Sequence, residues 1–252
     1  MEITTSKVVV TGGASGLGEA TARYLAGAGA AVALFDRDAA KGKAVAASLP
    51  DASFAEVDVT SEESVGAAVA EASDAMGGIT ALVNCAGIVT GARMVGKKGP
   101  FPLDMFQRTI DINLVGAFNV ARLAAAEMAK NTPNADGERG VIVNTASIAA
   151  YDGQKGQAAY ASSKAGVAGM SLPLARDMAG LGIRTMAIAP GLFLTPMLES
   201  LGPEMMAELA ADVVFPKRLG APEEFARMVR FIIEMAYLNG DTIRLDGALR
   251  LP

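Results

Sequence analysis

Histidine is absent from this chain, and cysteine occurs once, as Cys85. Without histidine the chain cannot build a Ser-His-Asp triad, a Cys-His dyad or a histidine-ligated metal centre. A single cysteine forms no intramolecular disulfide and excludes a multi-thiolate metal site. Acid–base chemistry near neutral pH must therefore come from carboxylates, lysine or tyrosine with shifted pKa values. We predict no bound metal.

A surplus of basic charge is also missing, since the formal net charge is −5. Nucleic acid is therefore not a predicted partner. The stretch from Met1 to Lys7 has no apolar core behind positive charge, unlike a signal peptide. No apolar run reaches the roughly 20 residues of a membrane-spanning helix. We expect no membrane contact and a reducing, cytoplasmic compartment.

Short apolar runs alternate with helical patterns along the whole chain, which predicts a parallel sheet covered on both faces. The fold class is α/β: one Rossmann domain over 1–252, doubly wound. The expected strands are Lys7 to Thr11, Ala31 to Phe35, Ser53 to Val57, Ala81 to Asn84, Val141 to Thr145, Arg184 to Ala189 and Thr242 to Leu245. The expected helices include Ala39 to Leu49, Glu62 to Met76 with a Ser61 cap, Leu103 to Ala129, Ala159 to Ala179 and Pro222 to Met235.

Two segments interrupt this alternation, Val89 to Leu103 and Leu192 to Pro216. Both follow the carboxyl ends of predicted strands, where open α/β sheets bind ligands. We interpret 192–216 as a substrate loop, in which Leu192, Phe193, Leu194, Met197, Leu198, Met205 and Met206 could form an apolar lid. Ordinary helix core is the alternative for each methionine.

A glycine-rich turn follows the first strand, with glycines at Gly12, Gly16 and Gly18. These glycines suit a tight turn, close approach of a pyrophosphate and close helix packing, and the following helix presents N–H donors. A plain turn is the alternative. Asp36 ends the second strand and can accept both ribose hydroxyls of NAD, although Arg37 beside it suits NADP.

Two further strand ends complete the predicted cofactor half. Asp58, followed by Val59, could bind the adenine amino group, and Asn84-Cys85-Ala86-Gly87 makes a sharp turn along the cofactor. We interpret Cys85 as a small buried residue, with a reactive thiol as the alternative.

Tyr160 and Lys164 lie four apart on one helix face. An adjacent ammonium and a positively charged nicotinamide would favour the tyrosine phenolate and lower its pKa, so that it could remove a hydroxyl proton. Ser147 could fix the substrate oxygen by a hydrogen bond. Each residue alone could equally be a surface tyrosine, a solvated lysine or a turn serine.

Together these motifs resemble the short-chain dehydrogenase/reductase family. The resemblance rests on Thr11-Gly-Gly-Ala-Ser-Gly-Leu-Gly18, Asn84-Cys-Ala-Gly87, Asn113, Ser147, Tyr160-Ala-Ser-Ser-Lys164 and Pro190-Gly191. It implies seven strands, a homotetramer and a catalytic tetrad of Asn113, Ser147, Tyr160 and Lys164. It also implies that the lysine holds the nicotinamide ribose and that the asparagine main chain holds a water in a proton relay.

On this basis we predict the residues that contact NAD and substrate. The predicted cofactor contacts are Gly12, Ser15, Gly16, Leu17, Gly18, Asp36, Asp58, Val59, Asn84, Ala86, Gly87, Tyr160, Lys164, Pro190, Gly191, Phe193 and Thr195. The predicted substrate contacts are Ser147, Gln157, Tyr160 and Leu198.

Within the family the chain is most similar to the type 2 3-hydroxyacyl-CoA dehydrogenases, also called 17β-hydroxysteroid dehydrogenases type 10. This closer resemblance rests on Thr11 to Gly18, Lys97-Lys98-Gly99, Gly140 to Ser147, Gly153-Gln154, Gly156 to Tyr160, Ile188 to Phe193, Asn239-Gly240 and Ile243 to Gly247. The resemblance implies oxidation of 3-hydroxyacyl-CoA thioesters, short branched ones included, and of some hydroxysteroids. Departures over Leu194 to Ala211 put the acyl-chain preference in doubt.

The leading hypothesis is an NAD-dependent enzyme of fatty acid metabolism that interconverts (S)-3-hydroxyacyl-CoA and 3-oxoacyl-CoA. Lys97 and Lys98 could then meet coenzyme A phosphates, or simply be a solvated loop tip. Alternatives are a 3-oxoacyl-carrier-protein reductase, which would prefer NADPH, and a hydroxysteroid dehydrogenase. An NAD-binding scaffold or regulatory protein, or a structural homo-oligomer with a vestigial site, are the non-enzyme alternatives.

Overall fold

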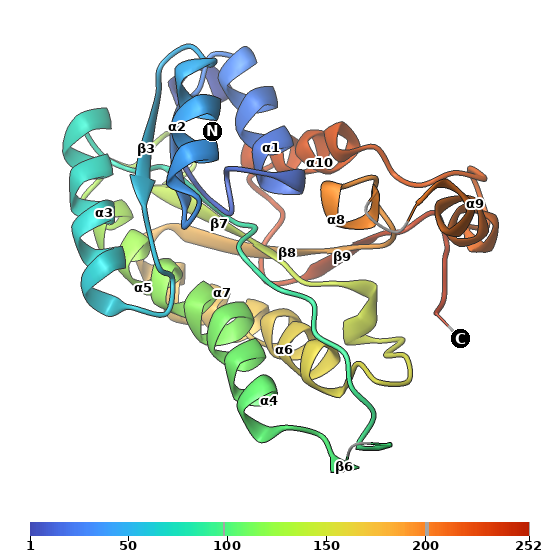
Figure 1. Ribbon diagram of the computed structural model, residues 1–252. Helices are drawn as coiled ribbons and strands as arrows, with labels where there is room; N and C mark the ends of the chain where they lie inside the picture. The colour runs from blue at the N-terminus through green and yellow to red at the C-terminus, as the bar shows by residue number, and fades with distance from the viewer. Residues whose placement is uncertain (98, 200–201, 252) are drawn as a thin grey trace.

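Seven parallel strands form the centre of the molecule (Figure 1), in the order β3-β2-β1-β4-β7-β8-β9. The computed structural model describes residues 1–97, 99–199 and 202–251. The strands are β1 (Lys7–Thr11), β2 (Ala31–Asp36), β3 (Ala52–Glu56), β4 (Ala81–Asn84), β7 (Gly140–Thr145), β8 (Ile183–Pro190) and β9 (Thr242–Leu245). The predicted seven-stranded Rossmann fold is confirmed, and each predicted strand is present within a residue or two.

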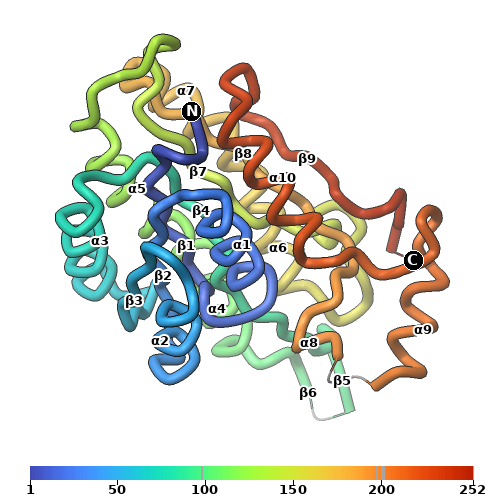
Figure 2. Tube along the Cα trace, turned by 90° about the horizontal axis from the view of Figure 1, so that it is seen from above, coloured from blue at the N-terminus to red at the C-terminus, as the bar shows by residue number. Residues whose placement is uncertain are grey.

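Helices cover both faces of this sheet. One face carries α1 (Gly16–Gly27), α2 (Ala39–Ala47) and α10 (Pro222–Glu234), and Figure 2 shows α1 and α10 side by side over the strands. The other carries α3 (Glu62–Met76), α5 (Gly116–Met128) and α7 (Ser171–Met178). Successive strand side chains point to opposite faces, so Val8 and Val10 pack in the first layer and Val9 in the second. The unbroken apolar runs follow from this double burial.

The strand order reverses between β1 and β4, because the chain builds outward from β1 to β3 and then in the other direction. In open α/β sheets such a point leaves a crevice at the carboxyl ends of the strands, where ligands bind. The glycine turn after β1 and the turn after β4 meet at this crevice.

The predicted helix from Leu103 to Ala129 is one continuous run with an internal irregularity. It consists of α4 (Leu103–Ile110), a π-helical stretch η2 (Asp111–Val115) and α5. Such wide turns inside α-helices are frequent at functional sites. The predicted helix from Ala159 to Ala179 is divided at Met170 into α6 (Ala158–Gly169) and α7, and the short turn η4 (Ala179–Leu181) follows.

Both interrupting segments contain structure that the sequence did not predict. The first includes an antiparallel hairpin, β5 (Val95–Gly96) with β6 (Gly99–Pro100), and the second includes α8 (Pro196–Glu199) and α9 (Pro203–Asp212). Lys98 and the side chain of Met197 lie outside the described residues. Across the described ranges, no helix is long and apolar enough to span a bilayer, and no group of three candidate ligands could hold a metal ion.

Arg184 on β8 is buried, and its hydrogen bonds fix this strand to α10. Its Nε donates to Glu138 at 2.6 Å. Its terminal nitrogens donate to the carbonyls of Ile232, Ile233 and Leu238 at 2.9 to 3.1 Å. A buried charge needs such partners, because losing one leaves the other charge unpaired in the interior.

Candidate active site

The turn after β1 is built so tightly that two of its glycines are required by space. Gly12 has φ +67°, and a Cβ there would lie 2.8 Å from the backbone nitrogen of Ala86. A Cβ on Gly18 would overlap the carbonyl oxygen of Gly12. The first helix therefore begins close against the strand, at Gly16 after the extended Ser15, and its first N–H groups have no intrahelical partner. Such groups bind phosphate oxygens.

A residue from the far end of the chain completes this turn. Thr195, just before α8, lies 3.7 Å from the position of a Cβ on Gly16. Leu17 instead turns inward and packs on the core under α10. The structure thus places Thr195 and Gly16 together, as expected for two contacts to one pyrophosphate, while the side chain of Leu17 belongs to the core.

Asp36 stands at the carboxyl end of β2, beside the glycine turn. Its Oδ2 accepts a hydrogen bond from the Ala14 N–H, and its Oδ1 accepts one from the Asp38 N–H, both at 3.0 Å. The carboxylate is thereby held in place, and its remaining lone pairs can accept ribose hydroxyls. A negative charge fixed there repels a 2′-phosphate, so the residues fit NAD.

Asp58 and Val59 follow β3 on the same side of the crevice. The Oδ1 atom of Asp58 accepts hydrogen bonds from the N–H and hydroxyl of Thr60, which lower the pKa of the Asp58 carboxyl. Val59 is buried, and its carbonyl accepts a 3.0 Å hydrogen bond from Asn119. Both residues are held in a defined geometry, as an adenine contact requires.

The side chain of Asn84 is buried and hydrogen-bonded within the protein, and it does not face the crevice. It accepts a hydrogen bond from Thr11 and donates to Asn144 at 2.9 Å and to the Ala117 carbonyl at 3.1 Å. Any contact of Asn84 with cofactor must therefore come from its backbone. Thr11, to which the sequence analysis gave no role, accepts hydrogen bonds from the N–H groups of Cys85 and Ala86 at 3.1 Å and so shapes this turn.

Cys85 is an inert thiol in this structure. Burial raises its pKa to about 11, although Thr145 donates a hydrogen bond to its sulfur. The thiolate is the reactive form of cysteine, and it is almost absent at neutral pH with such a pKa. The interpretation as a structural residue is supported over the reactive alternative.

The four predicted tetrad residues come from three separate elements. Asn113 lies in the π-helical stretch, Ser147 begins the short turn η3 (Ile148–Ala150) after β7, and Tyr160 and Lys164 lie on α6. The Lys164 Nζ is 5.9 Å from the centre of the Tyr160 ring. A Cβ on Gly87 would lie 3.2 Å from Asn113 Oδ1 and 3.6 Å from Lys164 Nζ. The fold thus gathers the tetrad beside the turn after β4.

Burial has the largest effect on the pKa values of Tyr160 and Lys164. Burial raises the pKa of Tyr160, and a hydrogen bond with Ser147 only partly opposes it. Burial also lowers the pKa of Lys164 from 10.5 to about 8. Desolvation disfavours the charged form of each group, so burial alone moves the two pKa values in opposite directions. The predicted lowering of the Tyr160 pKa includes the positive charge of a bound nicotinamide and stays a prediction.

Two of the tetrad side chains are held by backbone contacts. The amide of Asn113 donates to the Ile88 carbonyl at 2.9 Å and accepts from the Ile88 N–H at 2.8 Å, so its side chain is committed to the loop after β4. Its amide also donates to Ser163 at 3.0 Å. Lys164 donates to the Thr145 carbonyl at 2.7 Å. The bond to Ser163 explains a residue of the Tyr160–Lys164 segment that sequence reasoning left without a role.

The turn after β8 closes the crevice from above the sheet. Pro190 ends the strand, and a Cβ on Gly191 would lie 2.8 Å from the Cα of Asp246. Phe193 is buried and packs edge-to-face on Phe225, with ring centres 6.3 Å apart. Its side chain therefore belongs to the core, and a cofactor contact at this position would use the backbone.

The residues predicted to contact substrate lie in different surroundings. Gln157 is the residue before α6, and its amide is hydrogen-bonded to Gln154 at 3.2 Å. Leu198 lies half-buried on α8. Leu192 and Phe193 line a cavity of about 260 Å³ together with Val213, Leu245 and Gly247. Met205 is exposed on α9, so the apolar residues of the substrate loop do not all face one cavity.

These features match known proteins over nearly the whole chain. The model of the short chain dehydrogenase family matches residues 6–206. The chain belongs to the short-chain dehydrogenase family. This short-chain dehydrogenase is 53% identical to the human 3-hydroxyacyl-CoA dehydrogenase type-2, over 96% of this chain and 94% of the relative. It is 54% identical to the enzyme of that name from Drosophila melanogaster, over 96% of each.

A solved structure gives the same relationship. The crystal structure of a 3-hydroxyacyl-CoA dehydrogenase type-2 from Mycobacterium avium aligns with a TM-score of 0.95 and 46% identity, covering 99% of this chain and 98% of that one. The predicted family resemblance is confirmed. With its glycine turn and Asp36 in place, this short-chain dehydrogenase is an NAD-dependent enzyme.

Proposed function

We propose that this dehydrogenase interconverts (S)-3-hydroxyacyl-CoA and 3-oxoacyl-CoA. The relatives with half or more of their residues identical to this chain are named for 3-hydroxyacyl-CoA. The 3-oxoacyl-carrier-protein reductase of Thermotoga maritima shares 36%. The higher identity favours the coenzyme A thioester over the carrier-protein substrate.

The observation that supports the chemistry most strongly is the contact of Tyr160 with both Ser147 and Lys164 at the crevice. Ser147 is buried, its oxygen accepts the Ala149 N–H at 3.1 Å, and its hydroxyl is hydrogen-bonded with Tyr160, so both hydroxyls face one point at which a substrate oxygen could replace that bond. Tyr160 stands beside that oxygen and exchanges the proton with it. A bound NAD would supply the hydride acceptor, and its positively charged nicotinamide would favour the Tyr160 phenolate.

Lys164 and Asn113 support this proton exchange. With a pKa of about 8, the Lys164 ammonium is charged at pH 7, yet it can give up its proton without a large free-energy cost. Its bond to the Thr145 carbonyl points the ammonium toward the crevice. The side chain of Asn113 is fixed to Ile88, so its role in a relay falls to the main chain of the π-helical stretch.

Replacing Tyr160 with phenylalanine tests this assignment. Loss of the hydroxyl should lower kcat by at least about 10²-fold, because the variant lacks the proton-transfer group, while the Kd for NAD stays nearly unchanged. Tyr151→Phe is the matched control, since it removes the hydroxyl of an exposed tyrosine in the segment between β7 and α6. Substantial residual turnover in Tyr160→Phe would refute the role of Tyr160.

Comparison of kcat/KM for 3-hydroxyacyl-CoAs and hydroxysteroids, with NAD and with NADP, tests the substrate. The proposal expects the highest value for a 3-hydroxyacyl-CoA with NAD. A hydroxysteroid or NADP preference would contradict it.

The proposal extends to fatty acid metabolism in the cytoplasm and to a homotetramer. Val115 and Phe118 are about half exposed on the continuous helical run of α4, η2 and α5, and this apolar surface suits association with a second copy. Sedimentation velocity should show a tetramer. Replacing Phe118 with glutamate should shift the distribution to smaller species if this face is the interface.

A further inference from the structure

Two loops from distant parts of the chain join at the outer mouth of the catalytic crevice. The loop after β4 and the loop before α6 are linked by a 2.9 Å hydrogen bond from the Ala92 N–H to the Gly156 carbonyl. Asn113 holds the start of the first loop, and the second loop continues directly into Tyr160. The junction is therefore coupled to both ends of the catalytic tetrad.

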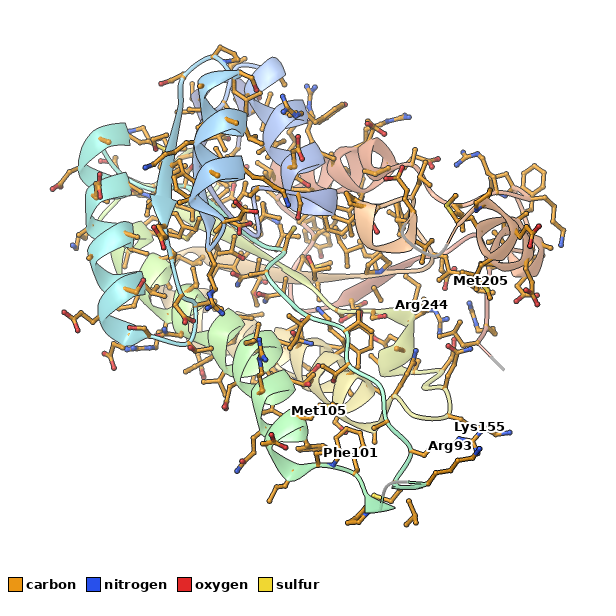
Figure 3. The ribbon with its side chains drawn as sticks, viewed as in Figure 1. Arg93, Phe101, Met105, Lys155, Met205 and Arg244 are labelled. Carbon is orange, nitrogen blue, oxygen red and sulfur yellow. The ribbon has the colours of Figure 1, made fainter. Side chains whose placement is uncertain are left out.

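Each loop places one cation beside this junction. Arg93 follows Ala92 and Lys155 precedes Gly156, and both side chains are exposed. Figure 3 shows their charged ends next to each other, directed outward from the joined loops. Two like charges held together repel each other unless an anion lies between them. Lys155 lies five positions before Tyr160, so at most about 18 Å of extended chain separates the two residues.

No carboxylate in the described ranges forms an ion pair with Arg93 or Lys155. Asp152, the acid nearest to Lys155 in the loop, is committed to Arg244, which also lowers the Asp152 pKa. These cations remain unpaired in a chain whose net charge is −5. The lip formed by Arg93 and Lys155 is therefore an anion site by charge.

Apolar side chains lie on the same part of the molecule as this pair, and acidic side chains lie on α9. Met105 is on α4 and Phe101 precedes that helix; Figure 3 shows both in the lower part of the view with Arg93 and Lys155, while Met205 of α9 lies above them. The α9 helix also carries Glu204 and Glu208, both exposed. A ligand with an apolar body and an anionic end fits this distribution, with its anionic end at the Arg93–Lys155 lip and away from α9. A neutral steroid would leave the lip unused.

We propose that Arg93 and Lys155 bind the phosphate groups of a coenzyme A thioester whose acyl end reaches Tyr160. This inference rests on the proposed function and gives it a second recognition point. Lys97, which the sequence also suggested for phosphate binding, is exposed in the β5–β6 turn, whereas the Ala92–Gly156 bond brings together Arg93 and Lys155.

A pair of thioesters with the same acyl group tests the lip. The enzyme is assayed with 3-hydroxybutyryl-CoA and with 3-hydroxybutyryl-N-acetylcysteamine, which lacks phosphates. In the Arg93→Gln/Lys155→Gln variant, KM for the coenzyme A ester should rise about tenfold with kcat nearly unchanged, as expected for two exposed charged contacts. The phosphate-free ester should be unaffected. Arg176→Gln, which removes an exposed cation on α7, is the control.

An equal rise in KM for both esters, or an unchanged KM for the coenzyme A ester, would overturn the proposal that Arg93 and Lys155 bind phosphate groups. The proposed function fails differently, by absence of turnover of both esters in the wild type. Even if neither ester is turned over, calorimetric titration of coenzyme A into the protein with NAD tests whether Arg93 and Lys155 bind its phosphates. Weaker binding by the double variant than by Arg176→Gln supports it, and equal or undetectable binding in all three proteins overturns it.

Discussion

Replacing Lys164 with methionine tests whether the active site holds a charge that reduces the stability of the fold. Lys164 is buried, and burial lowers its pKa from 10.5 to about 8. Since one pKa unit corresponds to about 1.4 kcal/mol, the charged ammonium costs about 3 kcal/mol at pH 7. Methionine would also leave the Thr145 carbonyl without its donor, which costs about 1–2 kcal/mol and opposes part of the gain.

The sign of the pH dependence follows from the direction of the shift. Between the folded pKa of about 8 and the unfolded value of 10.5, the folded protein has released a proton that the unfolded chain still binds. The stability of the wild type therefore rises with pH across this window, relative to a variant without the amine. Lys164→Met should be more stable than the wild type by about 1–2 kcal/mol at pH 7, and this advantage should disappear by about pH 10.

Urea unfolding followed by circular dichroism, without NAD, measures this difference at pH 7, 8, 9 and 10. Lys43→Met, which removes an exposed lysine on α2, controls for the general effect of losing a surface charge. Lys164→Met should also lose turnover, so that stability and activity change in opposite directions. A variant less stable than the wild type at pH 7, or a difference that does not vary with pH, would refute the reasoning.

Three further predictions concern the cofactor half. Gly18→Ala should lose more than about 2 kcal/mol in thermal unfolding because its Cβ overlaps the Gly12 carbonyl, whereas Gly27→Ala, which has open space, should lose nothing. An unchanged Gly18→Ala would contradict the packing argument. Asp36→Asn should lower the NAD/NADP ratio of kcat/KM at least about tenfold by removing the fixed charge; initial rates showing the same ratio would exclude this role. Cys85 is partly buried, and with a pKa of about 11 it should react with iodoacetamide at pH 7.5 far more slowly than a free thiol in intact-mass measurements; rapid alkylation would contradict the raised pKa.

Much of the fold could be predicted because its signals are local. Each strand is a short run of apolar residues and each helix has its own cap or periodicity, as in α3, where the Ser61 hydroxyl accepts the Ser64 N–H. Periodicity is visible in a window of a few residues. The π-helical stretch at Asn113 and the β5–β6 hairpin were missed because both arise within segments whose local pattern is helical or irregular.

The predicted tetrad and glycine turn also rest on local spacing, which fixes the helix face or strand end that carries each residue, and their roles stay predictions. The surroundings of these side chains could not be predicted from the sequence. Asn84 turned into the sheet because Thr11 and Asn144 lie on neighbouring strands, far apart in sequence. The inward direction of a side chain depends on such partners, and no local pattern records them.

By itself, the sequence determined the fold class, the cofactor turn and the residues able to move a proton. Only the tertiary structure decided the charge state of that chemistry and the position of the cations at its mouth. Burial raised the Tyr160 pKa and lowered that of Lys164, and one backbone bond, from Ala92 to Gly156, brought Arg93 beside Lys155. Desolvation and electrostatic interaction depend on distance in space, which sequence separation does not give.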